Sequence, residues 1–85
     1  MNDPKPPKRI SVPFLIQDIR IRVQGFSDMT IEKLIRNFKI KLCSDEIQID
    51  KYIIESTSIE LDPTSTETLS SKGITEDTRI VVLTK

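Results

Sequence analysis

Residues 31–42 place five apolar side chains on one stripe of a helix. The stripe recurs at i, i+3, i+4, i+7 and i+11 and consists of Ile31, Leu34, Ile35, Phe38 and Leu42. This spacing is typical of an amphipathic helix that packs on a second layer. Thr30, or Asp28 just before it, can accept hydrogen bonds from the first-turn amides. No glycine follows the helix, so residues 44–46 are expected to end it through side-chain hydrogen bonds.

Alternating, strand-like segments stand on both sides of the predicted helix. Apolar residues fall two apart from Ile10 to Phe14, and residues 19–23 alternate between apolar and cationic, so these segments are predicted to form a hairpin. The connection around residues 15–18 lacks an Asn-Gly or Gly-Gly pair, and a looser turn than the tight primed types is expected. Three further strands are predicted after the helix, at residues 52–54, 59–61 and 80–84.

One helix between a hairpin and later strands does not fit alternating parallel βαβ units, because its apolar stripe has to cover one face of a mostly antiparallel or mixed sheet. The predicted fold is therefore α+β, with a mixed sheet of about five strands packed on one amphipathic helix. The first and last strands are expected side by side in the middle. Residues 1–9 hold three of the five prolines and are predicted to be a flexible leader, and residues 10–85 one domain.

The composition excludes several classes of function. The 13 basic and 13 acidic residues balance without a long run of one sign, so we expect no nucleic-acid ligand. The longest apolar run, Ile80 to Leu83, is far shorter than a membrane helix requires. One cysteine without any histidine cannot build a zinc site or a Cys/His catalytic pair, and Cys43 is expected to be semi-buried at the helix end. We expect a cytoplasmic or nuclear monomer with no cofactor, no metal, no catalytic residue and no membrane contact.

In the closing segment, residues 68–83, Leu69 opens a short turn, a small-residue corner leads to Ile74, and a polar loop feeds the final apolar strand. This order resembles the last turn and final strand of ubiquitin. Together with the tripeptide at 30–32 that opens the helix, this order resembles the ubiquitin-like family over about residues 10–84. The resemblance implies the ubiquitin-like β-grasp fold. It also implies a buried set made of Ile10, Val12, Ile19, Ile21, Val23, Ile31, Leu34, Phe38, Tyr52, Ile54, Ile59, Leu69, Ile74, Ile80 and Val82.

The same resemblance implies an exposed apolar patch that most receptors of ubiquitin bind. Its expected members are Leu15 (or Ile16), Ile53 and Leu83, with Val81 beside them and Lys51 as a flanking charge. The pleat of a strand leads to the same face independently, because residues that alternate with core residues point away from the helix. We expect the patch to bind protein partners, either ubiquitin-receptor-type helices or proteasomal receptors. The alternative is that the leader or another domain covers these residues.

Other features bear on the kind of ubiquitin-like module. Conjugated members end in paired glycines, whereas this chain ends Leu83-Thr84-Lys85 and has its two glycines elsewhere, so conjugation is not expected. Arg20 and Arg22 alternate with apolar residues of the second predicted strand. They either face water and protect a sheet edge, or bind an acidic partner strand as in a Ras-binding or SUMO-type β-grasp module. The Ser/Thr-rich residues 64–71 are predicted to make turns, with phosphorylation as the alternative.

Overall fold

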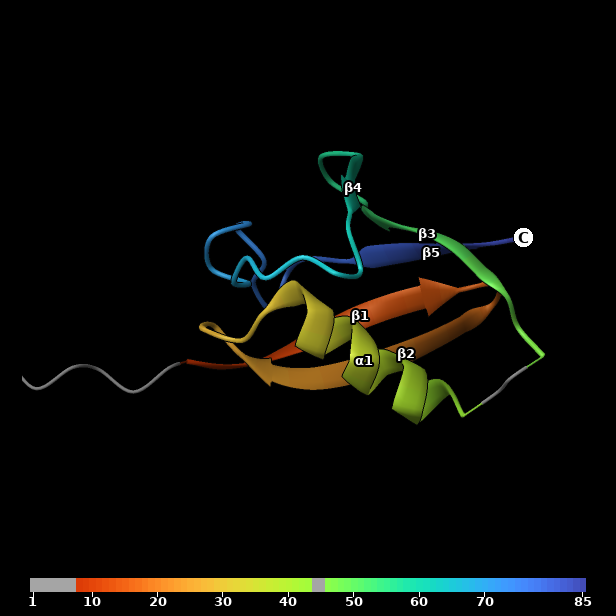
Figure 1. The fold of residues 1–85 in the computed structure, drawn as a ribbon, viewed down its shortest axis with the longest axis horizontal. Coiled ribbons are helices and arrows are strands. Elements are labelled where there is room, and N and C mark those ends of the chain that lie inside the picture. The colour runs from red at the N-terminus through yellow and green to blue at the C-terminus, as the bar shows by residue number, and fades with distance from the viewer. Residues whose placement is uncertain (1–7, 44–45) are drawn as a thin grey trace, which may run out of the picture.

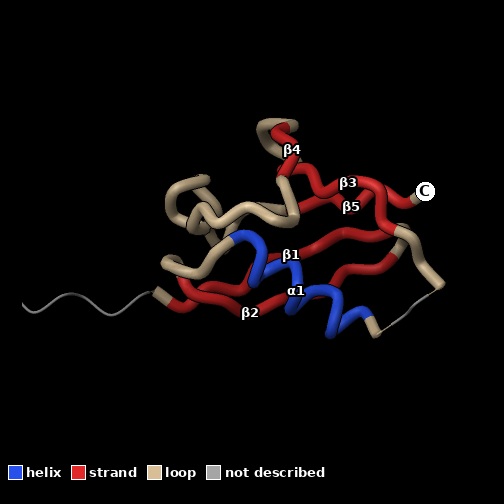
Figure 2. The backbone as a smooth tube through the Cα atoms, viewed as in Figure 1, coloured by secondary structure: helices blue, strands red, loops and turns tan. Residues whose placement is uncertain are grey.

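The computed structural model describes residues 8–43 and 46–85, so residues 1–7 of the expected leader and residues 44–45 of the expected helix end lie outside the described part. Within it, the elements follow one another as β1 (Arg9–Ile16), β2 (Ile19–Phe26), α1 (Ile31–Leu42), β3 (Ile49–Ile54), β4 (Ile59–Leu61) and β5 (Ile80–Thr84). The strands form one mixed sheet in the order β2-β1-β5-β3-β4, in which β1 and β5 are parallel. The helix packs on one face of this sheet (Figure 1, Figure 2). The predicted α+β fold is confirmed, with the first and last strands in the middle.

The β1–β2 hairpin closes through a two-residue turn, Gln17-Asp18, between the paired residues Ile16 and Ile19. Gln17 has a φ of 52°. A positive φ at the first central residue is what the primed turn types require, and glycine or asparagine usually provides it. The expectation of a looser connection is therefore wrong, because a glutamine adopts this conformation here.

Side-chain and backbone acceptors together cap the start of α1. The Thr30 side chain accepts a hydrogen bond of 3.2 Å from the backbone N–H three residues later, as predicted. The Ile31 amide donates to the Glu67 carbonyl at 2.9 Å. The Glu32 amide donates to the Ser65 carbonyl at 3.0 Å. The loop after β4 therefore satisfies amides that a helix start leaves without an intrahelical acceptor.

The helix ends at Leu42, which is partly buried against the core. Cys43 follows in the left-handed conformation, with a φ of 53°, and its amide donates to the Lys39 carbonyl. The side chain of Cys43 is exposed. The expected semi-buried cysteine is therefore wrong, since this residue lies past the last helical residue that packs on the sheet.

The core lies between α1 and the sheet. Its buried hydrophobic residues are Ile10, Val12, Phe14, Ile16, Val23, Ile31, Leu34, Ile35, Phe38, Tyr52, Ile54, Leu61, Leu69, Ile74, Ile80 and Val82. The Phe14 and Phe38 rings stack with centroids 4.4 Å apart, and Tyr52 meets both rings edge-on. Aromatic pairs in these geometries stabilise a fold beyond the area that they bury.

Two residues of the expected core are exposed instead. Ile19 is 50% exposed and Ile59 is 48% exposed. Each is the first residue of an edge strand and follows a turn, where the sheet has a neighbour on one side only. Ile21 is partly buried against the core, and Leu61 supplies the buried side chain of β4.

A β-bulge interrupts the pairing of β3 with β5. Ile49 pairs with Thr84 and Lys51 with Leu83, so Asp50 has no partner on β5. Since a bulge adds one residue to a strand, it shifts the alternation of side chains at this point.

The closing segment follows the expected pattern. Leu69 and Ile74 are buried, and the Ile74 amide donates to the Leu69 carbonyl at 2.9 Å. Gly73 stands between them with a φ of 72°, a conformation that glycine adopts without strain.

Candidate protein-interaction surface

A line of outward side chains crosses the sheet on the face opposite α1. Leu15 of β1 pairs with Val81 of β5, which pairs with Ile53 of β3. The line continues to Arg20 on the β2 edge and to Glu60 on the β4 edge. Paired residues of adjacent strands share a face, and the chain neighbours of the three central residues are core residues, so these side chains point away from the helix. We call Leu15, Val81 and Ile53 the apolar row.

The residues of the expected patch lie together on this face. The three members of the apolar row are half-buried. Leu83, two residues further along β5, is 40% exposed, and its exposed partner on β3 is Lys51. Ile16, the alternative to Leu15, is fully buried, so Leu15 is the residue that the hairpin contributes.

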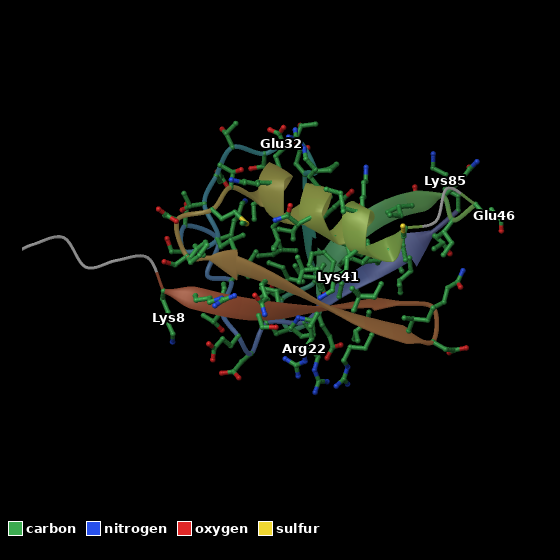
Figure 3. All side chains as sticks on the ribbon, turned by 90° about the horizontal axis from the view of Figure 1, so that it is seen from below. Lys8, Arg22, Glu32, Lys41, Glu46 and Lys85 are labelled. Atoms are coloured by element: carbon green, nitrogen blue, oxygen red, sulfur yellow. The ribbon has the colours of Figure 1, made fainter. Side chains whose placement is uncertain are left out.

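Charges are divided between the two edges of this face. Arg20 and Arg22 are exposed on β2, and Figure 3 shows Arg22 on the side of the sheet away from the helix. Glu60 is exposed on β4. Glu55, which directly follows β3, forms an ion pair of 3.6 Å with Arg79. The line through the apolar row therefore ends at the basic Arg20 on the β2 edge and at the acidic Glu60 on the β4 edge.

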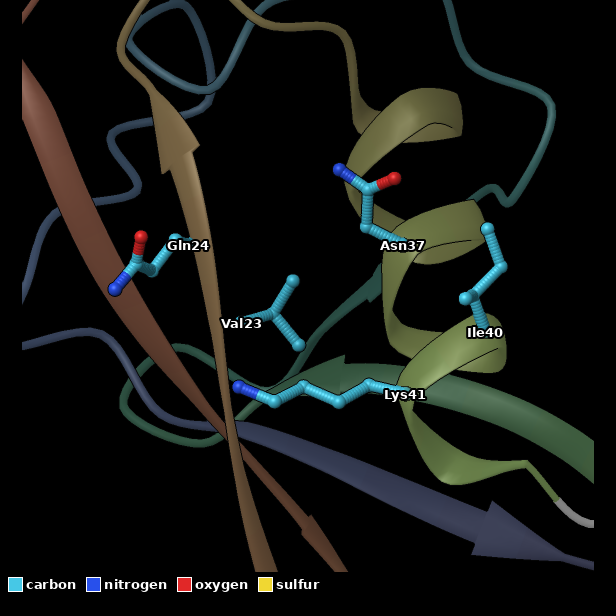
Figure 4. Close-up of a pocket in the computed structure, with 5 residues that line it drawn as sticks. All are labelled: Val23, Gln24, Asn37, Ile40 and Lys41. Atoms are coloured by element: carbon cyan, nitrogen blue, oxygen red, sulfur yellow. The ribbon is translucent and has the colours of Figure 1, made fainter.

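A second surface lies where β2, an edge strand, meets α1. A hollow of about 330 Å³ opens between them and is lined by Val23, Gln24, Asn37, Ile40 and Lys41 (Figure 4). Lys41 Nζ reaches across from the helix and donates to the Arg22 carbonyl. Arg22 pairs with Pro13, which has no N–H, so the backbone groups of Arg22 point to the open edge of the sheet.

Ile40 and Lys41 of this hollow were not among the predicted site residues. Ile40 is 68% exposed. Its signal in the sequence is that it is an apolar residue lying off the helical stripe. The contact of Lys41 with a backbone carbonyl of β2 has no signal in the sequence, because it depends on how the helix lies on the sheet.

Within residues 8–43 and 46–85, no three His, Cys, Asp or Glu side chains are grouped so that they can hold a metal ion. In the same residues no helix has the length and apolar character needed to cross a membrane.

The ionisable groups with shifted pKa values, Asp62 and Tyr52, lie in a turn and in the core. The backbone amide and then the hydroxyl of Thr64 donate hydrogen bonds to the Asp62 carboxylate and hold its pKa below the usual value. These hydrogen bonds belong to a turn. Burial raises the pKa of Tyr52, a core residue, to about 12. The outer face itself presents the apolar row between the exposed Arg20 and Glu60.

Several solved structures are similar to this chain. No protein-family model and no curated protein matches the sequence. The solution structure of the ubiquitin-like domain of Arabidopsis thaliana protein At2g32350 is similar, with a TM-score of 0.69 and 24% identity over 92% of this chain and 79% of that one. A protein designed on the basis of ubiquitin gives a TM-score of 0.69 at 22% identity, over 91% and 89% of the two chains. The N-terminal ubiquitin-like domain in the 4931431F19Rik protein gives 0.68 at 15% identity, over 100% and 85%.

The chain has the ubiquitin-like β-grasp fold. The resemblance seen in the sequence is thereby confirmed at the level of the fold. In this β-grasp chain, the apolar row and Leu83 lie on the outer face of the sheet, and Arg20 and Arg22 lie on its β2 edge.

Proposed function

We propose that this ubiquitin-like chain is an interaction module or adaptor that presents the apolar row and Leu83 to partner proteins. The observation that carries the proposal is the continuity of Leu15, Val81 and Ile53 across three adjacent strands. Single exposed aliphatic side chains are common on folded proteins and need no explanation. A contiguous apolar patch on a small domain usually marks a binding site.

The energy of such binding comes from apolar area removed from water. Burial contributes about 25 cal/mol per Å² before the cost of association is subtracted. Because the members of the row are already half-buried, each has a limited area left to lose, and we expect micromolar affinity. The charges at the rim mainly affect the rate of association and the choice of partner.

The proposed partners are ubiquitin-receptor-type helices or proteasomal receptors, met in the cytoplasm or nucleus by a monomeric domain. The module acts in the ubiquitin–proteasome pathway without being conjugated and without catalysis of its own. A sequence with no histidine and a single cysteine supports the proposed lack of catalysis.

A titration of the isotope-labelled domain with a ubiquitin-receptor helix tests the proposal. We expect amide shifts at Ile53, Val81 and Leu83. Ile53→Ala and Leu83→Ala should each weaken binding by about 1 kcal/mol or more and leave the domain folded, because central apolar anchors dominate small interfaces. Ile40→Ala is the matched control, since it removes an exposed isoleucine from the helix instead of the outer sheet face. Unchanged binding in both sheet variants would refute the proposal.

The open edge of β2 supports a second candidate, a Ras-binding or SUMO-type β-grasp module. Arg20 and Arg22 lie on this edge strand, and the backbone groups of Arg22 point outward from it. An acidic partner strand can add to such an edge through main-chain hydrogen bonds. It would have to displace Lys41 from the Arg22 carbonyl.

The two candidates differ in which residues respond to a partner. The probes are a small GTPase loaded with a GTP analogue and an acidic extended peptide. Shifts at Val23, Ile40 and Lys41 with none at Ile53 and Val81 would replace the first candidate by the second. These two sets are separable because Val81 and Ile53 lie on strands that are not neighbours of β2.

A further inference from the structure

The direction of the apolar row indicates how a partner lies on the outer face. We infer that this face binds an amphipathic helix that crosses the strands, with an acidic N-terminal end over Arg20 and a basic C-terminal end over Glu60. The inference rests on the proposed function and specifies the orientation and charge of its ligand.

Apolar surface on this face extends further across the strands than along any one of them. On β3, Ile53 stands between Lys51 and Glu55, which share its face. On β5, Val81 has Leu83 on one side and a charged residue on the other. The lateral direction joins three apolar side chains of three adjacent strands. A helix with an apolar stripe therefore finds its longest line of contacts across the sheet.

The spacing of strands matches the spacing of residues on a helix. Adjacent strands lie about 4.8 Å apart, so the apolar row spans roughly 10 Å and the line from Arg20 to Glu60 roughly 19 Å. Helix positions i, i+3, i+7, i+10 and i+14 lie on one stripe and span about 21 Å at 1.5 Å per residue. Such a stripe places one residue over each member of the line. The flexible arginine and glutamate side chains at its ends absorb the remaining difference of about 2 Å.

The charges determine the direction of the helix. Arg20, with Arg22 beside it on the same face, attracts acidic side chains, and Glu60 attracts basic ones. Helices carry acidic residues favourably in the first turn and basic residues in the last turn, because of the helix dipole. The ligand therefore has the stripe acidic, apolar, apolar, apolar, basic from its N-terminus to its C-terminus, and its N-terminus lies over β2.

Two synthetic helical peptides of about 20 residues test the inference. The first carries Glu at the first stripe position, Leu at the next three and Lys at the last. The second exchanges Glu and Lys, so the composition is the same and the polarity is reversed. We expect the first peptide to bind about 5- to 10-fold more tightly at low salt, because two weak ion pairs change sign together. The difference should shrink as ionic strength rises. Shifts are expected at Leu15, Val81 and Ile53.

Charge-exchange variants of the domain make the test specific. The double variant Arg20→Glu, Glu60→Lys should prefer the second peptide, since it reverses the polarity of the face. The double variant leaves the net charge of the domain unchanged. Lys33→Glu lowers the net charge instead, at a residue on the exposed side of α1. It should leave the preference for the first peptide unchanged. All substituted residues are exposed, and a melting temperature for each variant checks its fold.

Three results would overturn the inference, and each says something different about the proposed function. Equal affinity for the two peptides, lost in Ile53→Ala, would reject the orientation and leave the proposed function standing. Binding of neither peptide would reject the helix as ligand. The titration with a ubiquitin-receptor helix would then be the separate test of the proposed function. Self-association of the domain alone, abolished by Arg20→Glu, would mean that a second copy occupies the face.

Discussion

Truncation of Leu34 to alanine tests how the helix is held on the sheet. Leu34 is fully buried in the core. The substitution removes about three buried carbon groups, a loss of ~2.4 kcal/mol at about 0.8 kcal/mol each. The cavity that remains adds ~1 kcal/mol or more, and the better helix propensity of alanine returns a few tenths. We expect a total loss of about 2–5 kcal/mol, a large share of the roughly 5–15 kcal/mol that stabilises a typical domain.

Urea denaturation followed by circular dichroism measures this loss. With a slope of about 1 kcal/mol per molar urea, the midpoint should fall by roughly 2 M or more. Ile40→Ala is the matched control on the same helix, because Ile40 is 68% exposed and should change stability by no more than about 0.5 kcal/mol. If Leu34→Ala does not fold, Ile35→Val should still cost about 0.5–1.5 kcal/mol. A loss below about 0.5 kcal/mol for Leu34→Ala, or an equal loss for Ile40→Ala, would refute the assignment of the buried stripe.

Three further predictions concern the core, the closing turn and the bulge. The Tyr52 hydroxyl is buried and has no hydrogen-bond partner among the described residues, so Tyr52→Phe should stabilise the domain by about 1 kcal/mol. Because burial raises the pKa of Tyr52 to about 12, the folded state keeps a proton that the unfolded state loses from about pH 10, and stability falls as pH rises through this range. The urea midpoint should therefore fall between about pH 9 and pH 11, and this fall should be smaller in Tyr52→Phe than in the natural sequence. Gly73→Ala places a side chain at a φ of 72° and should cost about 1 kcal/mol in the same assay, and an unchanged midpoint would contradict the strain argument. Deletion of Asp50 removes the unpaired residue of the bulge and should shift the melting temperature by less than about 4 °C, whereas unfolding would show that the bulge is required.

Residue spacing alone predicts the helix stripe and the faces of the central strands. Ile31, Leu34 and Phe38 are buried as the helical period requires, and Ile53 and Val81 point away from the helix as the strand period requires. Both periods are local properties of the chain, so they can be predicted without knowledge of the tertiary contacts.

Contacts between distant segments set the features that spacing does not predict. Ile19 has the same alternation as its buried neighbours and is still exposed, since burial at the end of an edge strand depends on what covers it. The Ser65 and Glu67 carbonyls that accept from the start of α1, and the Arg22 carbonyl that accepts from Lys41, are backbone groups. Any residue type presents such a carbonyl, so the sequence carries no mark of these contacts.

The bulge at Asp50 allows Ile49 and Tyr52 to face the core while Ile53 faces outward. Ile49 packs against the core, and Tyr52, three residues later, is buried in it. Strict alternation places residues an odd number apart on opposite faces, so an uninterrupted strand cannot bury both. The extra residue resolves the conflict, and Ile53 stays on the outer face in register with its partner on β5. A strand that kept the phase of Ile49 throughout would turn Tyr52 to water and bury Lys51 without a partner charge, at a cost of several kcal/mol. The pairing that buries Tyr52 therefore also places Ile53 in the apolar row.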